Sequence, residues 1–411
     1  MNTGTKTMHN SSTPASAPSA PRVYYLDWLR VLAILMVFLF HAVHPFDLGD
    51  WQVKNIEQSE ILTIVLTFLS IWGMPFFFLT AGAAGWFALA RRTGRQYLSE
   101  RFTRLLLPFV VGAILFSPLE YYCETTNKIQ RGVLTSAPGF LSQFLTFNPR
   151  FLHFPGFSPR WFGAAGYHLW FLGFLFSFAL ITLPLFLWLK RPSGQAALAW
   201  MARRCEARGG LLLFVVPAAL IYCLLLPFFP LEHDWADFTF QMFFFVLGFI
   251  LFSDERFSRA LRRDWWLLLT LGVVITVGLV GLLLAGVPVL QWNETPSIPE
   301  FYLLQVLRST IAVCLSLVMV WVGMRFLDFT NRWLQYGQEA ALPVFVLHQP
   351  VIITIAFFVV QWNAGIAVKL PVVVLGSLAA TLALYELVIR RLGFLRILFG
   401  MKARRGSPLA S

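Results

Sequence analysis

The 411-residue chain is 58% hydrophobic and 13% charged, with a mean hydropathy of +0.69. These values exclude an ordinary soluble globular protein and indicate a chain that lies largely in lipid. The formal net charge is +12, but the basic residues fall between long apolar runs, so the charge does not indicate nucleic-acid binding. The chain has no P-loop, dinucleotide fingerprint or zinc motif, and its four cysteines follow no metal-ligand spacing. We therefore predict neither a metal site nor a tightly bound cofactor.

Residues 1–22 are rich in Ser, Thr, Pro, Ala and Asn, which predicts a disordered tail without the apolar run of a signal peptide. Ten segments long enough to span a membrane follow this tail. They lie at about residues 26–46, 61–88, 101–122, 168–189, 210–229, 236–252, 265–287, 301–325, 342–361 and 368–391. The prediction is an all-α polytopic membrane protein, with one transmembrane domain at 23–395 and a basic tail at 396–411.

The distribution of Lys and Arg predicts the orientation of the chain. If the amino terminus is cytoplasmic, 24 of the 32 Lys and Arg residues lie on the cytoplasmic side, six lie on the other side and two, Arg30 and Arg308, lie within spans. Acidic residues are concentrated in the outer segments instead, for example Asp47, Glu232 and Glu294. By the positive-inside rule both termini are cytoplasmic, and an even number of spans agrees with this. We expect a multi-pass protein of the inner (plasma) membrane.

The first span, Tyr24–Phe46, places ionisable groups at membrane depth, where they are costly and usually functional. Arg30 and His41 are eleven positions apart, about three helical turns, so they share a face and lie ~16 Å apart along the axis. His44 follows on nearly the same stripe. A neutral imidazole suits a general base, since it exchanges protons near neutral pH, and we assign that role to His41. Asp27, one turn before Arg30, offers the alternative of a structural ion pair.

The second and third spans carry two further features. Pro75, Gly82 and Gly85 in the second span either break the helix beside a cavity or form a plain packing face. The third span opens with Arg101 and Arg104, which lie on one face of the helix. Arg suits phosphate oxygens geometrically, which favours phosphate binding. The alternative is that these residues only set the orientation of the chain.

Four residues of the later spans are candidates for substrate-binding or supporting roles. His168 begins the fourth span beside Trp170. Arg308 lies in the outer third of the eighth span, and His348 lies in the ninth span, nearer the cytoplasm. The long outer segment 123–167 is rich in aromatic residues. We expect it to be either a lid or binding loop, or an amphipathic piece on the membrane surface.

At these residues the chain resembles the acyltransferase-3 superfamily of integral membrane acyltransferases. Within that superfamily it is most similar to the branch with the succinyltransferases of osmoregulated periplasmic glucans. The most specific shared feature is an Arg and a His separated by ten residues in the first span, here Arg30 and His41. The likeness covers about residues 24–391. Supporting stretches are Phe76–Gly82 (FFFLTAG), Arg101–Pro108 (RFTRLLLP) and His168–Phe176 (HLWFLGFLF).

The resemblance implies a membrane-bound O-acyltransferase. It implies transfer of acetyl, succinyl or a similar group from cytoplasmic acyl-coenzyme A to a hydroxyl of a carbohydrate, a lipid or another cell-envelope acceptor. It assigns the catalytic base to His41 and a catalytic and donor-binding role to Arg30. Arg101 and Arg104 are assigned to the donor by the same likeness.

Two positions depart from the family pattern. Ala81 stands where many members carry Ser, so no hydroxyl role is expected at that position. Many relatives also carry a Glu shortly after the Trp that corresponds to Trp170, and this chain does not. A carboxylate partner for His41 is therefore not expected from that position.

Other functions are compatible with the same residues. A proton-coupled secondary transporter would use His41, His348 and Glu386 as relay groups, although no convincing internal repeat relates the two halves of the chain. A purely structural or sensor role leaves the paired ionisable positions unexplained. A lipid-linked acyl donor is the alternative to acyl-coenzyme A, and it leaves the cytoplasmic Arg cluster without a ligand.

Overall fold

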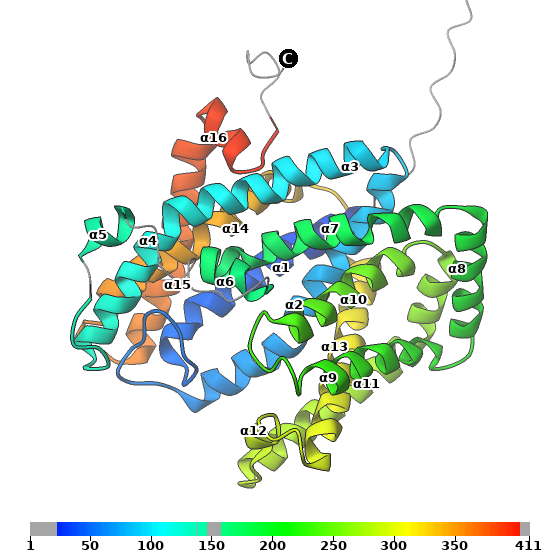
Figure 1. The fold of residues 1–411 in the computed structure, drawn as a ribbon, viewed down its shortest axis with the longest axis horizontal. Coiled ribbons are helices and arrows are strands. Elements are labelled where there is room, and N and C mark those ends of the chain that lie inside the picture. The colour runs from blue at the N-terminus through cyan, green and yellow to red at the C-terminus, as the bar shows by residue number, and fades with distance from the viewer. Residues whose placement is uncertain (1–22, 138, 146–157, 403–411) are drawn as a thin grey trace, which may run out of the picture.

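The computed structural model of the chain describes residues 23–137, 139–145 and 158–402, and every regular element within them is helical (Figure 1). The predicted tail 1–22 and the end of the predicted tail 396–411 lie outside the described residues. The helices are α1 (Tyr24–Val43), α2 (Glu60–Leu89), α3 (Gly94–Arg101), α4 (Leu107–Gln130), α5 (Phe140–Leu145), α6 (Arg160–Gly166), α7 (Trp170–Leu189), α8 (Pro192–Cys205), α9 (Val215–Leu225), α10 (Trp235–Leu251), α11 (Glu255–Leu284), α12 (Val289–Trp292), α13 (Pro299–Phe326), α14 (Arg332–Val359), α15 (Ile366–Leu384) and α16 (Gly393–Leu398). Shorter 3₁₀ or π turns extend them at η1 (His44–Phe46), η2 (Phe102–Leu106), η4 (Tyr167–Leu169), η5 (Gly210–Phe214) and η6 (Tyr385–Ile389).

The predicted all-α polytopic architecture is confirmed. Two of the ten predicted segments are shorter apolar helices, Gly210–Leu225 and Trp235–Leu251. A helix satisfies its own backbone hydrogen bonds, which is why an apolar helix can cross lipid. The cytoplasmic placement of both termini remains a prediction. Within the described part of the chain, eight helical stretches are long and apolar enough to cross a membrane: Tyr24–Phe46, Glu60–Leu89, Gly94–Gln130, Arg160–Leu189, Glu255–Leu284, Pro299–Phe326, Arg332–Val359 and Ile366–Ile389.

Helix α1 packs against α2, α13, α14 and α15, and it passes behind α6 and α7 in Figure 1. One of its faces is buried through Leu29, Ala33 and Phe38. On the opposite face Leu35 and Leu39 are each 42% exposed. A helix that is apolar on both faces but covered by protein on only one suits the boundary between protein and lipid. The protein-facing side is where polar groups of α1 can find partners.

Helices α2 and α10 meet at glycines rather than at large side chains. A Cβ atom at Gly82 would collide with the carbonyl oxygen of Phe245, and one at Gly248 would collide with that of Leu79. Each glycine therefore lets the backbone of the other helix approach closely. Helix α2 continues without a break through Pro75. The packing-face alternative for this span is confirmed, and the helix-breaking alternative is wrong.

The third predicted span is part of a longer helical stretch, Gly94–Gln130, so its predicted start is several residues late. A capping box formed by Thr93 and Gln96 begins this stretch, and its polar first turns carry no apolar signal. Within η2 the N–H of Leu107 donates to the carbonyl oxygen of Phe102, which makes a π turn. Such turns are frequent at functional sites, and this one lies among the predicted donor-binding arginines.

The predicted outer segment 123–167 is partly helical, because it contains the end of α4, all of α5 and all of α6. Residues 138 and 146–157 lie outside the described residues. Both alternatives for this segment, a lid and a surface-lying piece, therefore remain predictions.

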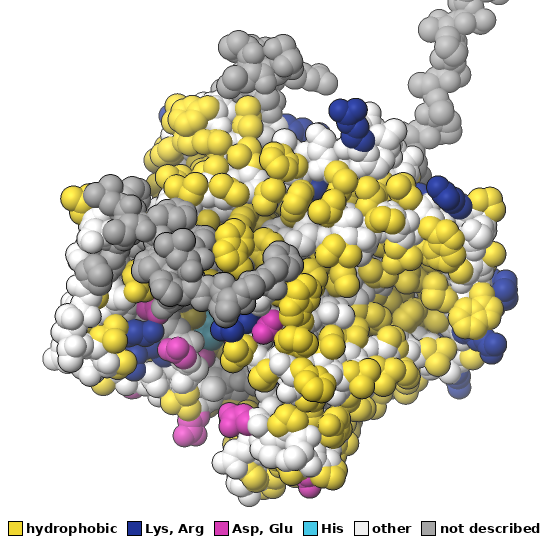
Figure 2. All heavy atoms as spheres, in the orientation of Figure 1, with side chains coloured by type: hydrophobic (Ala, Val, Ile, Leu, Met, Phe, Trp, Pro, Cys, Tyr) yellow, Lys and Arg dark blue, Asp and Glu magenta, His cyan; other side chains and the backbone are white. Residues whose placement is uncertain are grey.

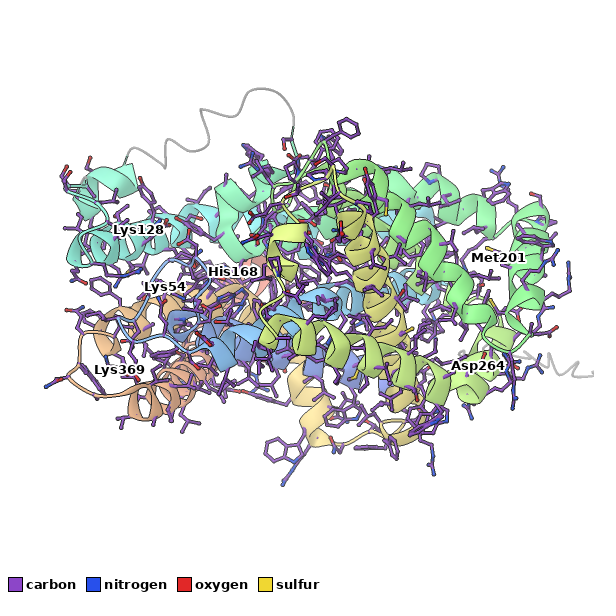
Figure 3. All side chains as sticks on the ribbon, turned by 90° about the horizontal axis from the view of Figure 1, so that it is seen from below. Lys54, Lys128, His168, Met201, Asp264 and Lys369 are labelled. Atoms are coloured by element: carbon purple, nitrogen blue, oxygen red, sulfur yellow. The ribbon has the colours of Figure 1, made fainter. Side chains whose placement is uncertain are left out.

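Charged side chains separate toward opposite ends of the molecule. On the face in Figure 2, most Lys and Arg side chains lie along the upper and right margins, over α3 and α8, and the Asp and Glu side chains gather toward the lower left. Seen from below in Figure 3, Lys54, Lys128 and Lys369 lie at one end and Asp264 lies at the other, with His168 between them. These three lysines are among the six basic residues assigned to the outer side, so the end that they mark is the predicted outer end, and His168 lies toward it.

Candidate active site

His41 on α1 and His348 on α14 contact each other directly. Nδ1 of His41 lies 3.0 Å from Nε2 of His348, within hydrogen-bond distance. Nδ1 of His348 lies 2.6 Å from the carbonyl oxygen of Phe345, which can only accept, so this nitrogen carries a proton. Nε2 of neutral His348 is then the acceptor, and Nδ1 of His41 donates to it. This assignment leaves Nε2 of His41 with a free lone pair, which is what a general base requires.

Aromatic rings surround this pair. Trp51 lies nearly parallel to His41, with ring centroids 6.3 Å apart, and nearly parallel to His44 at 5.6 Å. His168 packs edge-on against His348 with centroids 4.9 Å apart. His168 and His348 are buried, whereas His41 is partly exposed. Of the histidine cluster (His41, His44, His168 and His348), His41 therefore combines a free lone pair with access from outside the core.

A buried ion pair holds the loop that follows α1. Asp47 binds the ammonium group of Lys54 and lies 3.1 Å from Nδ1 of His44. Lys54 is 2% exposed and also donates to the carbonyl oxygen of His44, one of the orphan acceptors at the end of the helix. Burial alone would raise the pKa of Asp47, but hydrogen bonds and charges from His44 and Lys54 outweigh it and hold the pKa below 3.8. Burial lowers the pKa of Lys54 in spite of Asp47. The ion pair fixes the loop that carries Trp51.

Arg30 lies toward the other end of α1. Its Nη1 lies 3.5 Å from Oδ1 of Asp27, so the predicted ion pair is present, and its Nη2 donates to the carbonyl oxygen of Thr80 at 3.3 Å. Because α1 is unbroken, the rise of ~1.5 Å per residue keeps Arg30 and His41 ~16 Å apart. One helix thus carries a guanidinium group at one end and an imidazole at the other.

Arg101 and Arg104 lie close enough to Arg30 for their charges to act on it through space. The guanidinium carbon of Arg101 lies 4.9 Å from the ring centroid of Tyr97. Arg104 lies 3.5 Å from Glu100, and its side chain is 44% exposed. Two acidic side chains, Asp27 and Glu100, lie beside these three guanidinium groups. The excess positive charge suits an anionic ligand such as a phosphate.

The structure does not bring Trp170 and Arg308 to the histidine cluster. The indole of Trp170 packs against His233, with centroids 4.3 Å apart. Nη1 of Arg308 donates to Oδ1 of Asn293 at 2.8 Å, and its guanidinium carbon lies 5.6 Å from the ring centroid of Tyr222. The supporting roles predicted for these two residues stay predictions, without a contact to the cluster in the part of the chain that the structure describes.

Two residues of the site are not singled out by the sequence patterns. Glu120 on α4 is 1% exposed, and its Oε1 lies 3.6 Å from Nδ1 of His168. An acidic residue inside an apolar span is a signal that could have found it. Trp51 lies in a loop, and only the tertiary fold brings it over His41. Among the described residues, no group of three or more His, Cys, Asp or Glu side chains is arranged to hold a metal ion.

These observations define a class: a multi-pass helical membrane protein with a histidine cluster at one end of its first span and a cationic group at the far end of the same helix. The chain belongs to the Acyl_transf_3 family, whose model, described as an acyltransferase domain, matches residues 23–386. It is therefore a membrane acyltransferase.

Several bacterial proteins named glucans biosynthesis protein C are similar to this chain over nearly its whole length. Those of Salmonella paratyphi A (strain ATCC 9150 / SARB42), Salmonella typhi and Salmonella typhimurium are each 22% identical to it over 409 residues. In each case the similarity covers 94% of this chain and 97% of the relative. No solved structure matches the chain significantly.

Proposed function

We propose that this protein transfers an acyl group, such as acetyl or succinyl, from cytoplasmic acyl-coenzyme A to a hydroxyl of a cell-envelope glycan, with His41 as general base. The observation that carries the proposal is the 3.0 Å contact with His348, which leaves Nε2 of His41 free to accept a proton. The name of the Salmonella relatives supports a glucan or a similar glycan as acceptor, and an envelope lipid is the alternative. The protein would act in the inner (plasma) membrane.

Arg30, Arg101 and Arg104 bind the donor in this proposal. The phosphate groups of coenzyme A form charge-assisted hydrogen bonds with guanidinium groups, and these are stronger than neutral hydrogen bonds. The pantetheine arm then follows α1 from Arg30 toward His41, over the ~16 Å that separates them. The donor therefore reaches through the membrane domain from its cytoplasmic side, and the acceptor approaches from the opposite side.

The chemistry follows from the protonation of His41. Its Nε2 accepts the proton of the acceptor hydroxyl as the hydroxyl oxygen attacks the thioester carbonyl carbon. A C–O bond forms, the carbonyl electrons move onto the oxygen, and collapse of the tetrahedral intermediate breaks the C–S bond. The leaving thiolate takes the proton from the His41 imidazolium, which gives acylated glycan and free coenzyme A. Throughout, Nδ1–H of His41 donates to neutral His348, which orients and stabilises the charged imidazole.

Replacing His41 should abolish transfer. We expect His41→Ala to lower coenzyme A release from acetyl- or succinyl-coenzyme A by about 1,000-fold, within the range for loss of a general base. The assay uses purified protein in lipid nanodiscs with an oligoglucan acceptor, and mass spectrometry detects the acylated product. His233→Gln, which changes a histidine outside the cluster, is the control and should stay within about threefold of wild type. Wild-type activity of His41→Ala at an equal protein level would refute the mechanism.

The acyl group and the acceptor can be identified together. Envelope glycans and lipids from cells with and without the protein are compared by mass spectrometry. We expect a glycan species whose mass is greater by one acetyl or succinyl group only when the protein is present. An acylated lipid in place of a glycan would assign the alternative acceptor.

A proton-coupled secondary transporter is the second candidate function, and the contact between His41 and His348 is the observation that favours it. The hydrogen-bond pattern weighs against a relay, because Nδ1 of His348 donates to the carbonyl oxygen of Phe345, which does not pass a proton on. Binding of labelled acyl-coenzyme A to purified protein separates the two functions. Binding that is lost in Arg101→Ala supports the acyltransferase reaction, and absence of binding favours transport.

A further inference from the structure

Two side chains on one face of α4 hold the turn that leads into His168. Ser117 donates to the carbonyl oxygen of Ala165 at 2.8 Å, and the hydroxyl of Tyr167 donates to Oε2 of Glu124 at 2.9 Å. Tyr167 has φ 48°, a conformation that a non-glycine residue keeps only where its surroundings hold it. Helix α4 therefore determines the direction in which His168 leaves this turn.

Glu120 lies between Ser117 and Glu124 on the same face of α4 and reaches His168. Its Oε1 lies 3.6 Å from Nδ1 of His168, and both side chains are 1% exposed. Within the described part of the chain, neither carboxyl oxygen of Glu120 has a hydrogen-bond partner, and neither does Nδ1 of His168. Buried polar atoms without partners are costly, which favours a hydrogen bond between Oε1 of Glu120 and Nδ1 of His168.

The other nitrogen of His168 is tied to α14 by an acceptor that a proline makes available. Pro350 has no N–H, so the carbonyl oxygen of Val346, four residues earlier in α14, has no helical donor. Nε2 of His168 lies 3.3 Å from this oxygen. Because a carbonyl oxygen can only accept, Nε2 carries the proton, and Nδ1 of neutral His168 presents a lone pair to Glu120. The same imidazole packs edge-on against His348.

We propose that Glu120 is a positioning residue: it keeps its carboxyl proton, donates it to Nδ1 of His168, and so fixes the imidazole against which His348 packs. A lone pair on Nδ1 needs a donor, and protonated Glu120 is the donor in reach. The alternative, a carboxylate beside an imidazolium, buries two charges where a neutral hydrogen bond suffices. The path from Glu120 through His168 to the Val346 carbonyl links α4 to the part of α14 that carries His348. This inference rests on the proposed function, in which His348 orients His41.

Two substitutions at Glu120 distinguish a hydrogen-bond donor from a space-filling group. The side-chain amide of Gln can donate to Nδ1 in place of the carboxyl proton, whereas Ala leaves Nδ1 without a donor. We expect Glu120→Gln to keep kcat within about threefold of wild type. We expect Glu120→Ala to lower kcat by roughly 30-fold, the scale of a lost supporting hydrogen bond, with KM for the donor nearly unchanged. Equal losses in both variants, or wild-type kcat in both, overturn the proposal.

Glu124→Gln is the matched control, because it makes the same change one turn later on α4. Glu124 is bound by Lys128 at 2.7 Å and by Tyr167, and a Gln oxygen can still accept from Tyr167. We expect wild-type kinetics for this variant. A loss as large as that of Glu120→Ala would assign the effect to the charge or stability of α4 and overturn the specific role of Glu120.

Nitrogen-15 NMR of histidine-labelled protein in bilayers tests the proton position without any turnover. At pH 7 we expect neutral His168 with its proton on Nε2 and with Nδ1 accepting a hydrogen bond. The Nδ1 resonance, assigned by its absence in His168→Asn, should move to the position of a free lone pair in Glu120→Ala but hardly move in Glu120→Gln. An imidazolium or a proton on Nδ1 overturns the proposal. If His168 shows the expected state and wild-type protein transfers no acyl group, the failure lies with the proposed reaction and not with the pair.

Discussion

At the scale of single residues, backbone carbonyl oxygens determine which nitrogen of each buried histidine carries the proton, because a carbonyl oxygen can only accept a hydrogen bond. The carbonyl oxygen of Phe345 places the proton of His348 on Nδ1. Nε2 of His348 is then an acceptor, which places the proton of His41 on its Nδ1. In a serine protease the orienting group is a buried carboxylate. In the proposed mechanism the neutral imidazole of His348 performs the same orientation without the desolvation cost of a buried charge, which suits a site between membrane-spanning helices.

Replacing His348 should therefore lower kcat more than it changes KM. Without Nε2 as acceptor, the ring of His41 is free to turn and to adopt the other tautomer. We expect His348→Phe to reduce kcat by roughly 100-fold or more, with KM changed by less than about threefold. His348→Gln should retain more activity than His348→Phe, because its amide oxygen can accept from Nδ1 of His41. Steady-state kinetics in nanodiscs measure both, and a loss confined to KM would contradict this role.

The ion pair between Asp47 and Lys54, in the loop that carries Trp51, should make the thermal stability of the protein fall in acid. The folded-state pKa of Asp47 lies below the unfolded value of 3.8, so its contribution is complete above about pH 4 and is lost as pH falls through the lower, folded pKa. We expect Asp47→Asn to lower the Tm by roughly 2 °C at pH 6 and to flatten the decline of Tm between pH 5 and 3. Thermal unfolding in detergent measures this. Asp50→Asn, an exposed acid of the same loop, is the control, and an unchanged pH dependence in Asp47→Asn would contradict the assignment.

At the scale of helices, residues that usually interrupt a helix serve contacts between helices here. Gly82 and Gly248 allow α2 and α10 to touch backbone to backbone, and α2 continues through Pro75. Pro350 leaves α14 continuous but frees the Val346 carbonyl oxygen for His168. In lipid, where the hydrophobic effect does not drive helices together, such close contacts and hydrogen bonds hold the bundle.

Gly82→Ala should destabilise the protein although it improves helix propensity. The added Cβ would collide with the carbonyl oxygen of Phe245, so the two helices must separate. We expect a loss of about 2 kcal/mol or more, which exceeds the helix-propensity gain of about 1 kcal/mol. Gly278→Ala in α11 is the control, since its Cβ would meet nothing within 4 Å. Unfolding in a mixed-detergent titration compares them, and equal stability of both variants would contradict the packing argument.

At the scale of the whole molecule, most basic side chains on the face in Figure 2 lie over α3 and α8, and the acidic side chains gather away from them. The two ends of α1 follow this separation. Arg30 lies near Arg101 and Arg104, and His41 lies near the loop with Asp47 and Lys54. This polarity gives the proposed reaction a direction, with the anionic donor at the basic end and the glycan at the other.

Cysteine labelling tests the predicted orientation. In a variant whose four cysteines are replaced by Ser, a single cysteine is introduced at Glu206 or at Glu294, both exposed. We expect a membrane-impermeant maleimide to label Glu294→Cys in intact spheroplasts and Glu206→Cys only after lysis, because the positive-inside rule puts residue 206 in the cytoplasm. The reverse pattern would place both termini outside and separate Arg30 from a cytoplasmic donor.

The sequence by itself determined the membrane architecture and the placement of Arg30 and His41 on one face of the same helix. Both are local properties: the length of an apolar run is set by the thickness of the bilayer, and the spacing of two residues on one unbroken helix is set by its rise and period. The family motifs are also short and contiguous, so the family was predictable from them.

Only the tertiary structure decided which groups meet His41. His348 is 307 residues away in the chain, and no local period relates residues on different helices. The same limit explains why Glu120 and Trp51 were not singled out, and why Trp170 and Arg308, which are equally plausible by composition, lie against other partners. A helix period determines which face a residue lies on, whereas the packing of several helices determines what that face contacts.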